Sequence, residues 1–533
     1  MELNLKGLTD IEGDIRLPSF DVAHMQKIGK ETPRWVQIGP GNIFRIFVAR
    51  IAHDLITDGH MWPVTGVQTL SPKELDLQLV AHDLMSLGVT LNPDGKRDLR
   101  VIAGLSEALA TQREEDFARL VEIFRSDSLS LVSFTITEKG YAVHTSTGEL
   151  QPMLVEELNT DPRGYHVHTM VLIAGLLLHR FEAGGAPITM LSTDNFSHNG
   201  DKLRESLLIV ARGWKENGRV DNDFISWLSD EKNVSFPISV IDKITPRPHE
   251  EVSRQLAELG FTDMGIELVG RTPVAGFVNA EPTEYLIIED KFAGERPPFE
   301  NYGVRIVDRQ VCDDFENMKV TTCLNPLHTA LAISGCLLRM PTIDSEMRDP
   351  ALCAMVNELG WKEGLPVVVD PGVVAPEDFL REVLNVRFPN TYLPDDPARI
   401  AMDTSQKIPI RFGETIKKYI ERDLDLDSLH TIPLVFALWL RYLTGIADDG
   451  KPFTPASDPL LDELQELLGG VQLGAALSAD EAHEILAPIL SNAQIFAVDL
   501  YTTPLAKKVE VYFAELISAP GAVRRVLERE YAN

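Results

Sequence analysis

The sequence predicts an α/β protein in which an N-terminal domain with a parallel sheet is followed by a mostly α-helical C-terminal domain. Strand-like and helix-like stretches alternate between residues 35 and 193, as in a parallel sheet covered by helices. After about residue 300, long amphipathic stretches dominate and no β-rich run of comparable length occurs. The 533 residues also exceed the size at which one core keeps growing. We therefore expect two domains.

The elements of the first half follow from local pattern. A strand at Val36–Ile38 is followed by a helix from about Asn42 to Ile56, where apolar residues recur at helical spacing. A second strand at Val64–Leu70 ends before Ser71-Pro72, a cap residue and a proline that together start a helix. Further strands are expected at Leu99–Ala103, Leu129–Thr135, Ile188–Ser192 and Ser235–Ile241.

The second half is predicted to be helical. The connector Arg296-Pro297-Pro298 is predicted to be the boundary between the two domains. We expect an N-terminal arm over residues 1–30, an α/β domain over 31–299 and a mostly helical domain over 300–533. The clearest amphipathic stretches are Leu327–Met340, Pro376–Val386, Ile432–Thr444 and Pro504–Ala519.

Composition excludes several classes of function. Fifty basic and eighty acidic residues give a net charge of -30, which repels nucleic acids and anionic membrane surfaces. No apolar run reaches the roughly 18 residues of a membrane span, and the first residues lack the features of a signal peptide. Four cysteines without a Cys-x-x-Cys pair predict reduced thiols. We expect a cytoplasmic protein that binds small molecules, as a monomer or small homo-oligomer.

Residues 35–45, Trp-Val-Gln-Ile-Gly-Pro-Gly-Asn-Ile-Phe-Arg, predict a pyrophosphate site. Gly39 permits the tight turn, Gly41 lets the backbone approach the phosphates, and the following helix contributes N–H donors. Phe44 stands where a third glycine is usual, so a plain strand-to-helix turn is the alternative reading. The place of the motif after the first strand favours a dinucleotide.

The end of the second strand leaves the choice of cofactor open. It reads Gln68-Thr69-Leu70-Ser71, with no acid for the ribose hydroxyls of NAD and no arginine for the extra phosphate of NADP. We expect NAD, with NADP as the alternative.

Residues 319–329, Lys-Val-Thr-Thr-Cys-Leu-Asn-Pro-Leu-His-Thr, bring a potential base, an amide and an imidazole together without metal-ligand spacing. These groups transfer protons and, with a nucleotide site, indicate a dehydrogenase. Asp194-Asn195 and Asp242-Lys243 follow other expected strands, although turn formation is the simpler reading of each. His166 and His168 lack further ligands for zinc, so no metal site is predicted.

These motifs together resemble the polyol-specific long-chain dehydrogenases, a family that includes mannitol 2-dehydrogenase, fructuronate reductase (mannonate oxidoreductase) and tagaturonate reductase. The likeness spans most of the chain in consistent order. It is carried by residues 39–45, 135–141, 192–200, 240–246, 288–297, 319–328, 387–390 and 403–409.

The resemblance implies a Rossmann-type N-terminal domain, a largely helical C-terminal domain, metal-independent chemistry and an active site in the cleft between them. Lys319 matches the general acid and base, Asn195 and Asn325 match the amides that hold the reacting oxygen, and His328 matches the residue that orients the substrate. The remaining implied residues are Asp242 in the site, Arg387 on the substrate, and Gly39, Gly41, Asn42, Phe44, Arg45 and Glu138 on the cofactor.

This sequence departs from the family at the catalytic segment. The family usually has Lys-x4-Asn, but one extra residue separates Lys319 from Asn325, and Pro326 replaces a common glycine. A one-residue bulge would absorb the insertion. Lys243 is the reserve candidate for the base.

The expected activity is NAD(P)-dependent interconversion of a keto sugar acid and an aldonate, with fructuronate to mannonate as the first choice. The substrate carboxylate needs a fixed cation, for which Arg387 and Lys407 are the candidates. Mannitol 2-dehydrogenase and tagaturonate reductase remain alternatives, because the motifs divide between them. A catalytically silent nucleotide-binding sensor and a zinc-dependent dehydrogenase are rivals from other classes.

Overall fold

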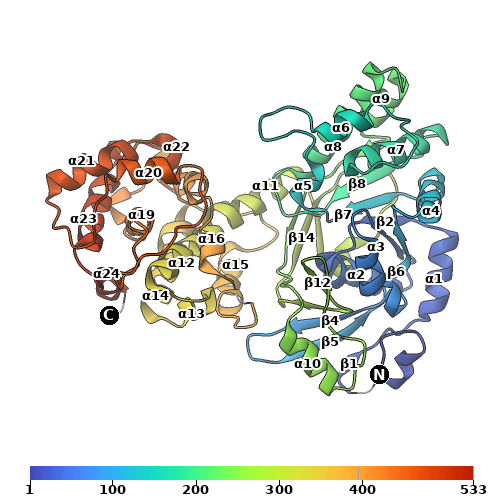
Figure 1. Ribbon diagram of the computed structural model, residues 1–533, viewed down its shortest axis with the longest axis horizontal. Helices are drawn as coiled ribbons and strands as arrows, with labels where there is room; N and C mark the ends of the chain where they lie inside the picture. Colours follow the sequence, from blue (N-terminus) through green and yellow to red (C-terminus); the bar gives the residue numbers. More distant parts are fainter. Residues whose placement is uncertain (12, 394, 532–533) are drawn as a thin grey trace. The chain divides into compact units, whose positions relative to one another are not determined.

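The structure is a computed structural model that describes residues 1–11, 13–393 and 395–531 (Figure 1). The chain divides into two compact units, Met1–Cys312 and Asp313–Asn533. The division falls later than the boundary expected at residue 299. The reason is β15 (Val304–Val307), which pairs in parallel with β14 (Tyr285–Glu289) and so belongs to the first unit.

A six-stranded parallel sheet forms the centre of the first unit. Its spatial order is β6-β3-β2-β7-β8-β9, and every neighbouring pair is parallel. Numbered along the chain, this is the order 3-2-1-4-5-6 of the dinucleotide-binding fold. The predicted Rossmann-type domain is therefore confirmed. The strands are β2 (Trp35–Ile38), β3 (Val64–Gln68), β6 (Leu105–Ala110), β7 (Leu131–Phe134), β8 (Ile188–Ser192) and β9 (Val234–Ser235).

The central strands are buried on both faces, as continuous apolar strands of a covered parallel sheet should be. On one face Val36 and Ile38 pack with apolar residues of α4, α7 and α8. On the other face Trp35 packs with residues of η2 and α2. The helices of the first unit are α1 (Val22–Glu31), η2 (Phe44–Val48), α2 (Ala49–Thr57), α3 (Pro72–Gln78), α4 (Glu114–Arg125), α5 (Thr137–Tyr141), α6 (Pro152–Glu157), α7 (Thr169–Glu182), α8 (Asn199–Glu216), α9 (Asn222–Ser229) and α10 (Glu250–Glu258).

One predicted strand, and the second part of another, belong to other sheets. The expected strand at Leu99–Ala103 is β5 (Arg97–Ile102), which pairs antiparallel with β4 (Ser86–Leu91) because the short turn between them cannot cross over to a parallel position. The expected strand at Ser235–Ile241 is interrupted at Pro237, which has no N–H to donate. Its first part is β9, and its second part is β10 (Ser239–Asp242), which pairs antiparallel with β14.

The N-terminal residues pack closely on the first unit. The Met1 ammonium donates to Gly260 O at 2.6 Å, and β1 (Ile15–Arg16) pairs with β5. β1, β5, β4 and β13 (Phe277–Ala280) form a four-stranded sheet, and β11 (Glu267–Val269) pairs with β12 (Thr272–Val274).

The second unit is helical, as predicted. Its described residues contain no strand and a single isolated bridge between Ile446 and Pro452. Helix α19 is buried on all sides. After α11 (Arg309–Met318), the helices are α12 (Asn325–Leu338), α13 (Ile343–Met347), α14 (Pro350–Glu358), α15 (Pro376–Glu382), α16 (Pro397–Ile400), α17 (Thr404–Ile408), α18 (Glu414–Glu421), α19 (Thr431–Leu443), α20 (Leu461–Leu467), α21 (Ala479–Leu490), α22 (Ala493–Phe496), α23 (Leu505–Ile517) and α24 (Ala522–Tyr531).

Segments of π-helix interrupt the second unit repeatedly. Each widens one helical turn by a residue, and such turns are frequent at functional sites. They are η5 (Lys319–Cys323), η6 (Leu359–Gly364), η8 (Val383–Arg387) and η9 (Pro409–Gly413). η5 contacts both η6 and η9, so three of these segments meet. Within the part of the chain that the structure describes, no helix is both long and apolar enough to cross a membrane.

Candidate active site

The carboxyl ends of β2 and β7 lie side by side where the strand order of the central sheet reverses, the usual position of a dinucleotide. Gly39 begins the turn after β2 with a φ of +80°, and a Cβ there would lie 2.3 Å from Thr135 O. A side chain at position 39 therefore conflicts with both the backbone conformation and the neighbouring strand. At Gly41, by contrast, a Cβ would meet no atom within 4 Å. The open space at Gly41 fits the close approach of a pyrophosphate.

Hydrogen bonds fix the turn after β2 to the end of β7. The Thr135 hydroxyl donates to Gly39 O at 2.5 Å, and the Gln37 amide donates to Thr135 Oγ1 at 2.9 Å. Gln37 is buried within β2, so its polar side chain needs these partners. The two strand ends are thereby held in one arrangement.

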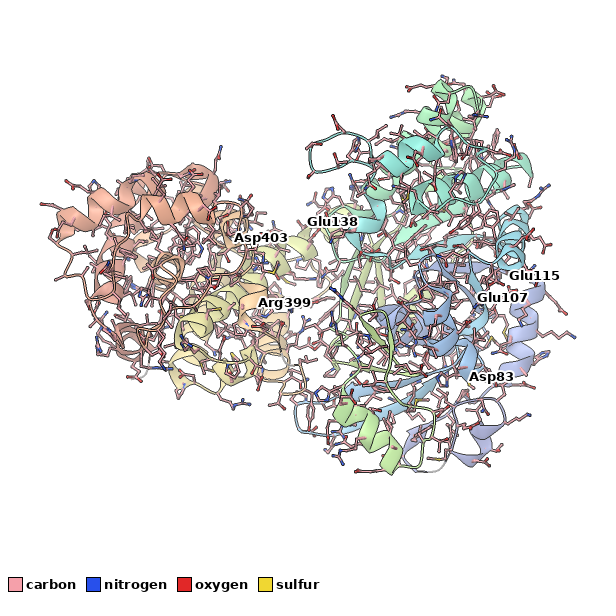
Figure 2. All side chains as sticks on the ribbon, viewed as in Figure 1. Asp83, Glu107, Glu115, Glu138, Arg399 and Asp403 are labelled. Carbon is pink, nitrogen blue, oxygen red and sulfur yellow. The ribbon has the colours of Figure 1, made fainter. Side chains whose placement is uncertain are left out.

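Asp194 positions the turn that carries Glu138. Its carboxylate accepts hydrogen bonds from Ile136 N at 2.9 Å, Thr137 N at 2.8 Å and Tyr141 Oη at 2.6 Å. Thr137 has a φ of +62°, an unfavourable conformation for threonine that these bonds stabilise. Burial raises the pKa of Asp194, against the hydrogen bonds that favour its charged form. Glu138 is exposed on α5 immediately after this turn (Figure 2).

Two of the expected cofactor residues lie inside the first unit. Phe44 and Arg45 are fully buried. The Arg45 guanidinium donates to Ser86 Oγ at 2.9 Å, Ala275 O at 3.0 Å and Gly276 O at 2.8 Å, and burial lowers the pKa of Arg45 to about 9. Arg45 joins η2 to neighbouring strands, so we keep Gly39, Gly41, Asn42 and Glu138 as cofactor candidates and leave Phe44 and Arg45 out.

The end of β3 presents an amide and an exposed leucine. Gln68 Oε1 accepts a hydrogen bond from Leu70 N at 3.0 Å, and the Leu70 side chain is 76% exposed. Gln112 Nε2 donates to Leu70 O at 2.9 Å. In dinucleotide-binding folds the adenosine ribose lies at this edge of the sheet. Hydrogen bonds to the ribose hydroxyls would here come from neutral groups.

The other candidates of the first unit follow strands β8 and β10. Asn195 is exposed after β8, whereas Asp242 is buried at the end of β10. Asn199 connects the end of β8 to the beginning of β10, since its Nδ2 donates to Asp194 O at 2.8 Å and to Ser239 O at 3.0 Å. The reserve base Lys243 donates to Glu281 O at 2.9 Å and pairs with Glu284 at 3.0 Å. Those contacts give Lys243 a structural role.

The bulge expected between Lys319 and Asn325 is present. Residues Lys319–Cys323 form η5, and Leu324 N donates to Lys319 O at 3.1 Å across the widened turn. Asn325 then begins α12, and its carbonyl accepts a hydrogen bond from Thr329 Oγ1 at 2.9 Å. Lys319 is buried, with 5% of its surface exposed. The insertion is thus absorbed within one turn, and α12 continues undisturbed.

His328 lies on the first turn of α12 and has two partners that the sequence did not suggest. Its Nε2 lies 3.1 Å from Asp395 Oδ2, and its ring centroid lies 5.2 Å from that of Phe388. Burial lowers the pKa of His328, although Asp395 acts in the opposite direction. Burial would raise the pKa of Asp395, but His328 and Arg399 outweigh it and lower that pKa. A neutral imidazole that donates from Nε2 to a charged carboxylate agrees with the lowered pKa of His328 and with the lowered pKa of Asp395.

Three cations of the second unit lie on η8, α17 and η9. Arg387 is buried at the end of η8. Lys407 donates to Ile400 O at 3.2 Å and to Met402 O, and burial together with the charge of Arg411 lowers the pKa of Lys407. Arg411, on η9, donates to Thr329 Oγ1. Arg411 and Asp395 are the residues that sequence reasoning missed, because neither belongs to the segment that carries Lys319, Asn325 and His328.

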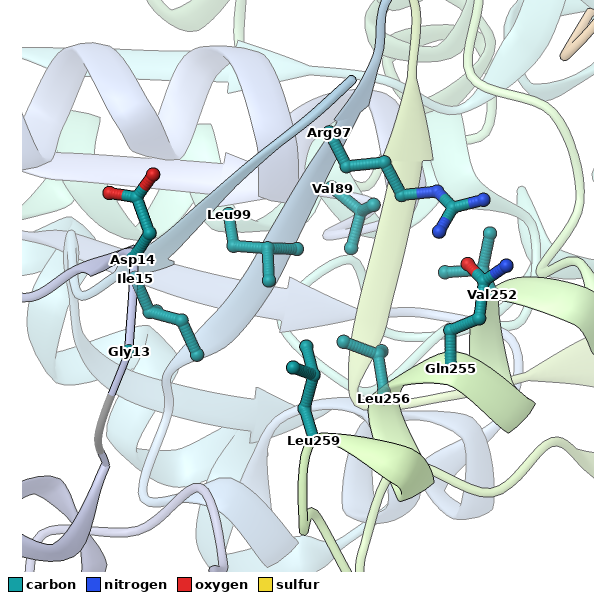
Figure 3. Close-up of a pocket in the computed structure, with 10 residues that line it drawn as sticks. All are labelled: Gly13, Asp14, Ile15, Val89, Arg97, Leu99, Val252, Gln255, Leu256 and Leu259. Carbon is teal, nitrogen blue, oxygen red and sulfur yellow. The ribbon is translucent and has the colours of Figure 1, made fainter. Parts of the chain in front are cut away.

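One pocket of the first unit lies apart from these residues. It has a volume of about 250 Å³ and apolar walls between β1, β5 and α10 (Figure 3). No candidate site residue lines it. Among the described residues, no group of three histidines, cysteines or acids is placed to hold a metal ion.

Glu346 is a buried carboxyl group on which the charge of Asp395 acts. It is fully buried on α13, and neither carboxyl oxygen has a hydrogen-bond partner among the described residues. A Cβ at Gly335 would lie 1.6 Å from Glu346 Oε1, so α12 packs directly on the group. Burial, followed by the charges of Asp344 and Asp395, raises the pKa of Glu346 to about 9. The folded protein therefore holds this group protonated at neutral pH.

Replacing Glu346 with Gln should stabilise the protein increasingly as pH rises. A group whose pKa is raised on folding contributes stability below its unfolded value of 4.5 and loses that contribution as pH rises toward 9. Gln does not ionise, so the difference in free energy of unfolding should grow by about 1.4 kcal/mol per pH unit in this interval. Chemical denaturation at pH 5, 7 and 9 measures it, with Glu466→Gln on the surface as the control. Parallel pH curves for parent and variant would contradict the assignment.

Comparison with known proteins identifies the family. Residues 33–301 match the Mannitol dehydrogenase Rossmann domain, and residues 312–516 match the Mannitol dehydrogenase C-terminal domain. The chain is 46% identical to a D-mannonate oxidoreductase of Thermotoga maritima over 520 residues, which cover 96% of this chain and 95% of that protein. It is 28% identical to a Polyol:NADP oxidoreductase of Gluconobacter oxydans, with 86% and 89% coverage.

Solved structures agree with these matches. A ternary complex of Pseudomonas fluorescens mannitol 2-dehydrogenase with NAD and D-mannitol superposes with a TM-score of 0.70 at 26% identity, covering 99% of both chains. A substrate-free D-sorbitol dehydrogenase shares the fold, with a TM-score of 0.81 at 24% identity and coverage of 98% and 100%. With both domains matched in order, the chain belongs to the mannitol dehydrogenase family.

Proposed function

We propose that this protein is an NAD(P)-dependent secondary-alcohol dehydrogenase that interconverts fructuronate and mannonate. The similarity to the Thermotoga maritima D-mannonate oxidoreductase over almost the full length of both chains carries the choice of substrate. The geometry of each unit supports the choice of reaction, because one has the glycine turn proposed for the dinucleotide and the other has a buried lysine on the π-helical turn before α12, the helix that carries the amide and the imidazole. A cytoplasmic location is part of the proposal, supported by four cysteines that form no disulfide in the described chain.

NAD is the proposed cofactor, and it fits the edge of the central sheet. Gly41 leaves room for the pyrophosphate, and the N-terminus of the following helix offers N–H donors. Asn42 and Glu138 stand at the same edge, after β2 and β7. The nicotinamide supplies or accepts the hydride when it is bound. NADP remains the alternative, since Gln68 and Leu70 provide no acidic group that would reject a ribose phosphate.

The protein residues move the proton and hold the oxygen. In ketone reduction, Lys319 gives a proton to the carbonyl oxygen as the hydride reaches the carbon; in alcohol oxidation it removes that proton. The amides of Asn195 and Asn325 donate hydrogen bonds to the oxygen as negative charge develops. His328, held by Asp395, orients the substrate, and Arg387 and Asp242 complete the set of proposed site residues.

Removing either amide should lower turnover. Asn325→Ala and Asn195→Ala should each reduce the catalytic constant by about 10²–10³-fold, because a preorganised donor to the developing oxyanion is lost. Steady-state kinetics measures this effect. Asn357→Ala on α14 is the control, since its amide donates to Cys353 O within its own helix. An effect confined to the Michaelis constant would mean that the amides bind substrate without stabilising the transition state.

Cofactor absorbance with candidate substrates tests the proposal directly. Purified protein is mixed with NADH or NADPH and with fructuronate, tagaturonate or fructose. Fastest oxidation with fructuronate is the expected result. Preference for fructose would favour a mannitol 2-dehydrogenase, the second candidate, which the mannitol-bound structural relative supports. Cofactor binding without turnover of any of the three would favour the silent sensor.

A further inference from the structure

Arg411, which is half-buried, differs from the fully buried Arg180 and Arg441. Arg180 donates to five backbone carbonyls, and Arg441 donates to three backbone carbonyls and a hydroxyl, so each is saturated by its surroundings. Arg411 donates to one neutral group, Thr329 Oγ1. Burial lowers the pKa of Arg411 to about 10 without an acid acting against it. Within the described chain, the Arg411 guanidinium therefore has no acidic partner, and its one hydrogen bond leaves further N–H donors available.

The surroundings of Arg411 are those of the proposed substrate site. Its partner Thr329 follows His328 on α12, and its charge lowers the pKa values of His328 and Lys407 after the larger effect of burial. Asp395 is the acid that faces His328, and it is already paired with both His328 and Arg399. The charges of Asp403 and Asp458 act to raise the pKa of Lys407. Asp458 also accepts hydrogen bonds from Ser405. Asp395 and Asp458 are thus engaged with other groups, in a protein whose net charge is -30.

We propose that Arg411 is the residue that binds the carboxylate of the sugar-acid substrate. A guanidinium can donate two parallel hydrogen bonds to a carboxylate, and that ion supplies the missing counter-charge. Lys407 is less suited, because its ammonium already donates to two carbonyls. Arg411 therefore separates sugar acids from neutral polyols of the same length. The inference rests on the proposed function. It gives Arg411 the role of binding the substrate carboxylate, for which the sequence suggested Arg387 and Lys407.

The test compares an acid with its neutral counterpart. For Arg411→Gln, kcat/KM should fall about 10–100-fold on fructuronate, as expected for loss of hydrogen bonds to a charged group. The effect should lie mainly in KM, and kcat/KM on fructose should change less than about threefold. Arg411→Lys should recover part of the loss on fructuronate. Arg422→Gln is the matched control, because that exposed arginine also has one neutral acceptor, Pro366 O. Equal losses on both substrates, or an unchanged KM for fructuronate, would overturn the inference.

Two further measurements separate this inference from the proposed function and from a role in folding. Calorimetric titration of the NAD-loaded protein with mannonate and with mannitol needs no turnover. Arg411→Gln should weaken mannonate binding selectively, and equal weakening of both ligands would overturn the inference even if fructuronate is not turned over. Thermal unfolding should show an unchanged or higher Tm for Arg411→Gln, because an unbalanced buried charge is removed. A lowered Tm together with unselective binding loss would assign Arg411 to the fold.

Discussion

Replacing Lys319 with Met should remove most turnover, about 10²–10⁴-fold, while leaving cofactor affinity near that of the parent. Met has nearly the length of lysine but cannot hold or release a proton. Lys319 is buried in η5 in the second unit, whereas the proposed pyrophosphate site lies in the first. Single-turnover kinetics and a separate NADH titration measure the two quantities independently.

The control for this substitution is Lys418→Met. Lys418 belongs to α18, which contacts η5, and its ammonium donates to Asn317 Oδ1 at 3.0 Å. Lys418 is half-buried near the candidate base and has no proposed part in the chemistry. Near-normal turnover in Lys319→Met would exclude Lys319 as the acid and base. Lys243 would then be examined next, although its pairing with Glu284 predicts that Lys243→Met mainly lowers stability.

Replacing Gly41 with Val should abolish cofactor binding in a protein that still folds. The structure gives a Cβ at this position open space, so the side chain meets no protein atom near its attachment. It would occupy the volume through which the pyrophosphate approaches the backbone. Fluorescence titration with NADH measures binding, and circular dichroism reports folding.

Two other glycines make this experiment specific. Gly265 is also open and exposed in the first unit, so Gly265→Val should retain both folding and cofactor affinity. Gly39→Val should instead disturb folding, since Gly39 combines a positive φ with a Cβ position 2.3 Å from Thr135 O. Unchanged NADH affinity in Gly41→Val would place the nucleotide elsewhere.

The catalytic segment was predictable because its chemistry is local in sequence. Lys319, Asn325 and His328 lie within ten consecutive positions, so η5 and the first turn of α12 carry all three without long-range contacts. The same locality made the bulge predictable, because one extra residue in a helix must be absorbed by a wider turn. The turn at Gly39 is equally local.

Partners across the chain were not predictable in this way. Asp395 contacts His328, and Arg411 contacts Thr329, which is 82 residues away in sequence. These contacts form because α12 packs beside segments that occur much later in the sequence. Nothing in the spacing of charged residues marks such pairs. Arg45 gives the converse case, since a residue in the right motif for a cofactor is turned into the core by packing against β4 and β13.

The sequence by itself determined the alternating α/β half, the glycine turn at the start of the central sheet, the helical second half and the local grouping of Lys319, Asn325 and His328. Periodicity and turn chemistry encode these features over a few residues. The tertiary structure alone decided that β5 and β10 lie outside the central sheet, that Asp194 stabilises the turn before Glu138, and that Arg411 donates to the Thr329 hydroxyl. These outcomes depend on which distant surfaces pack together, and packing reflects the shape and burial of the whole chain.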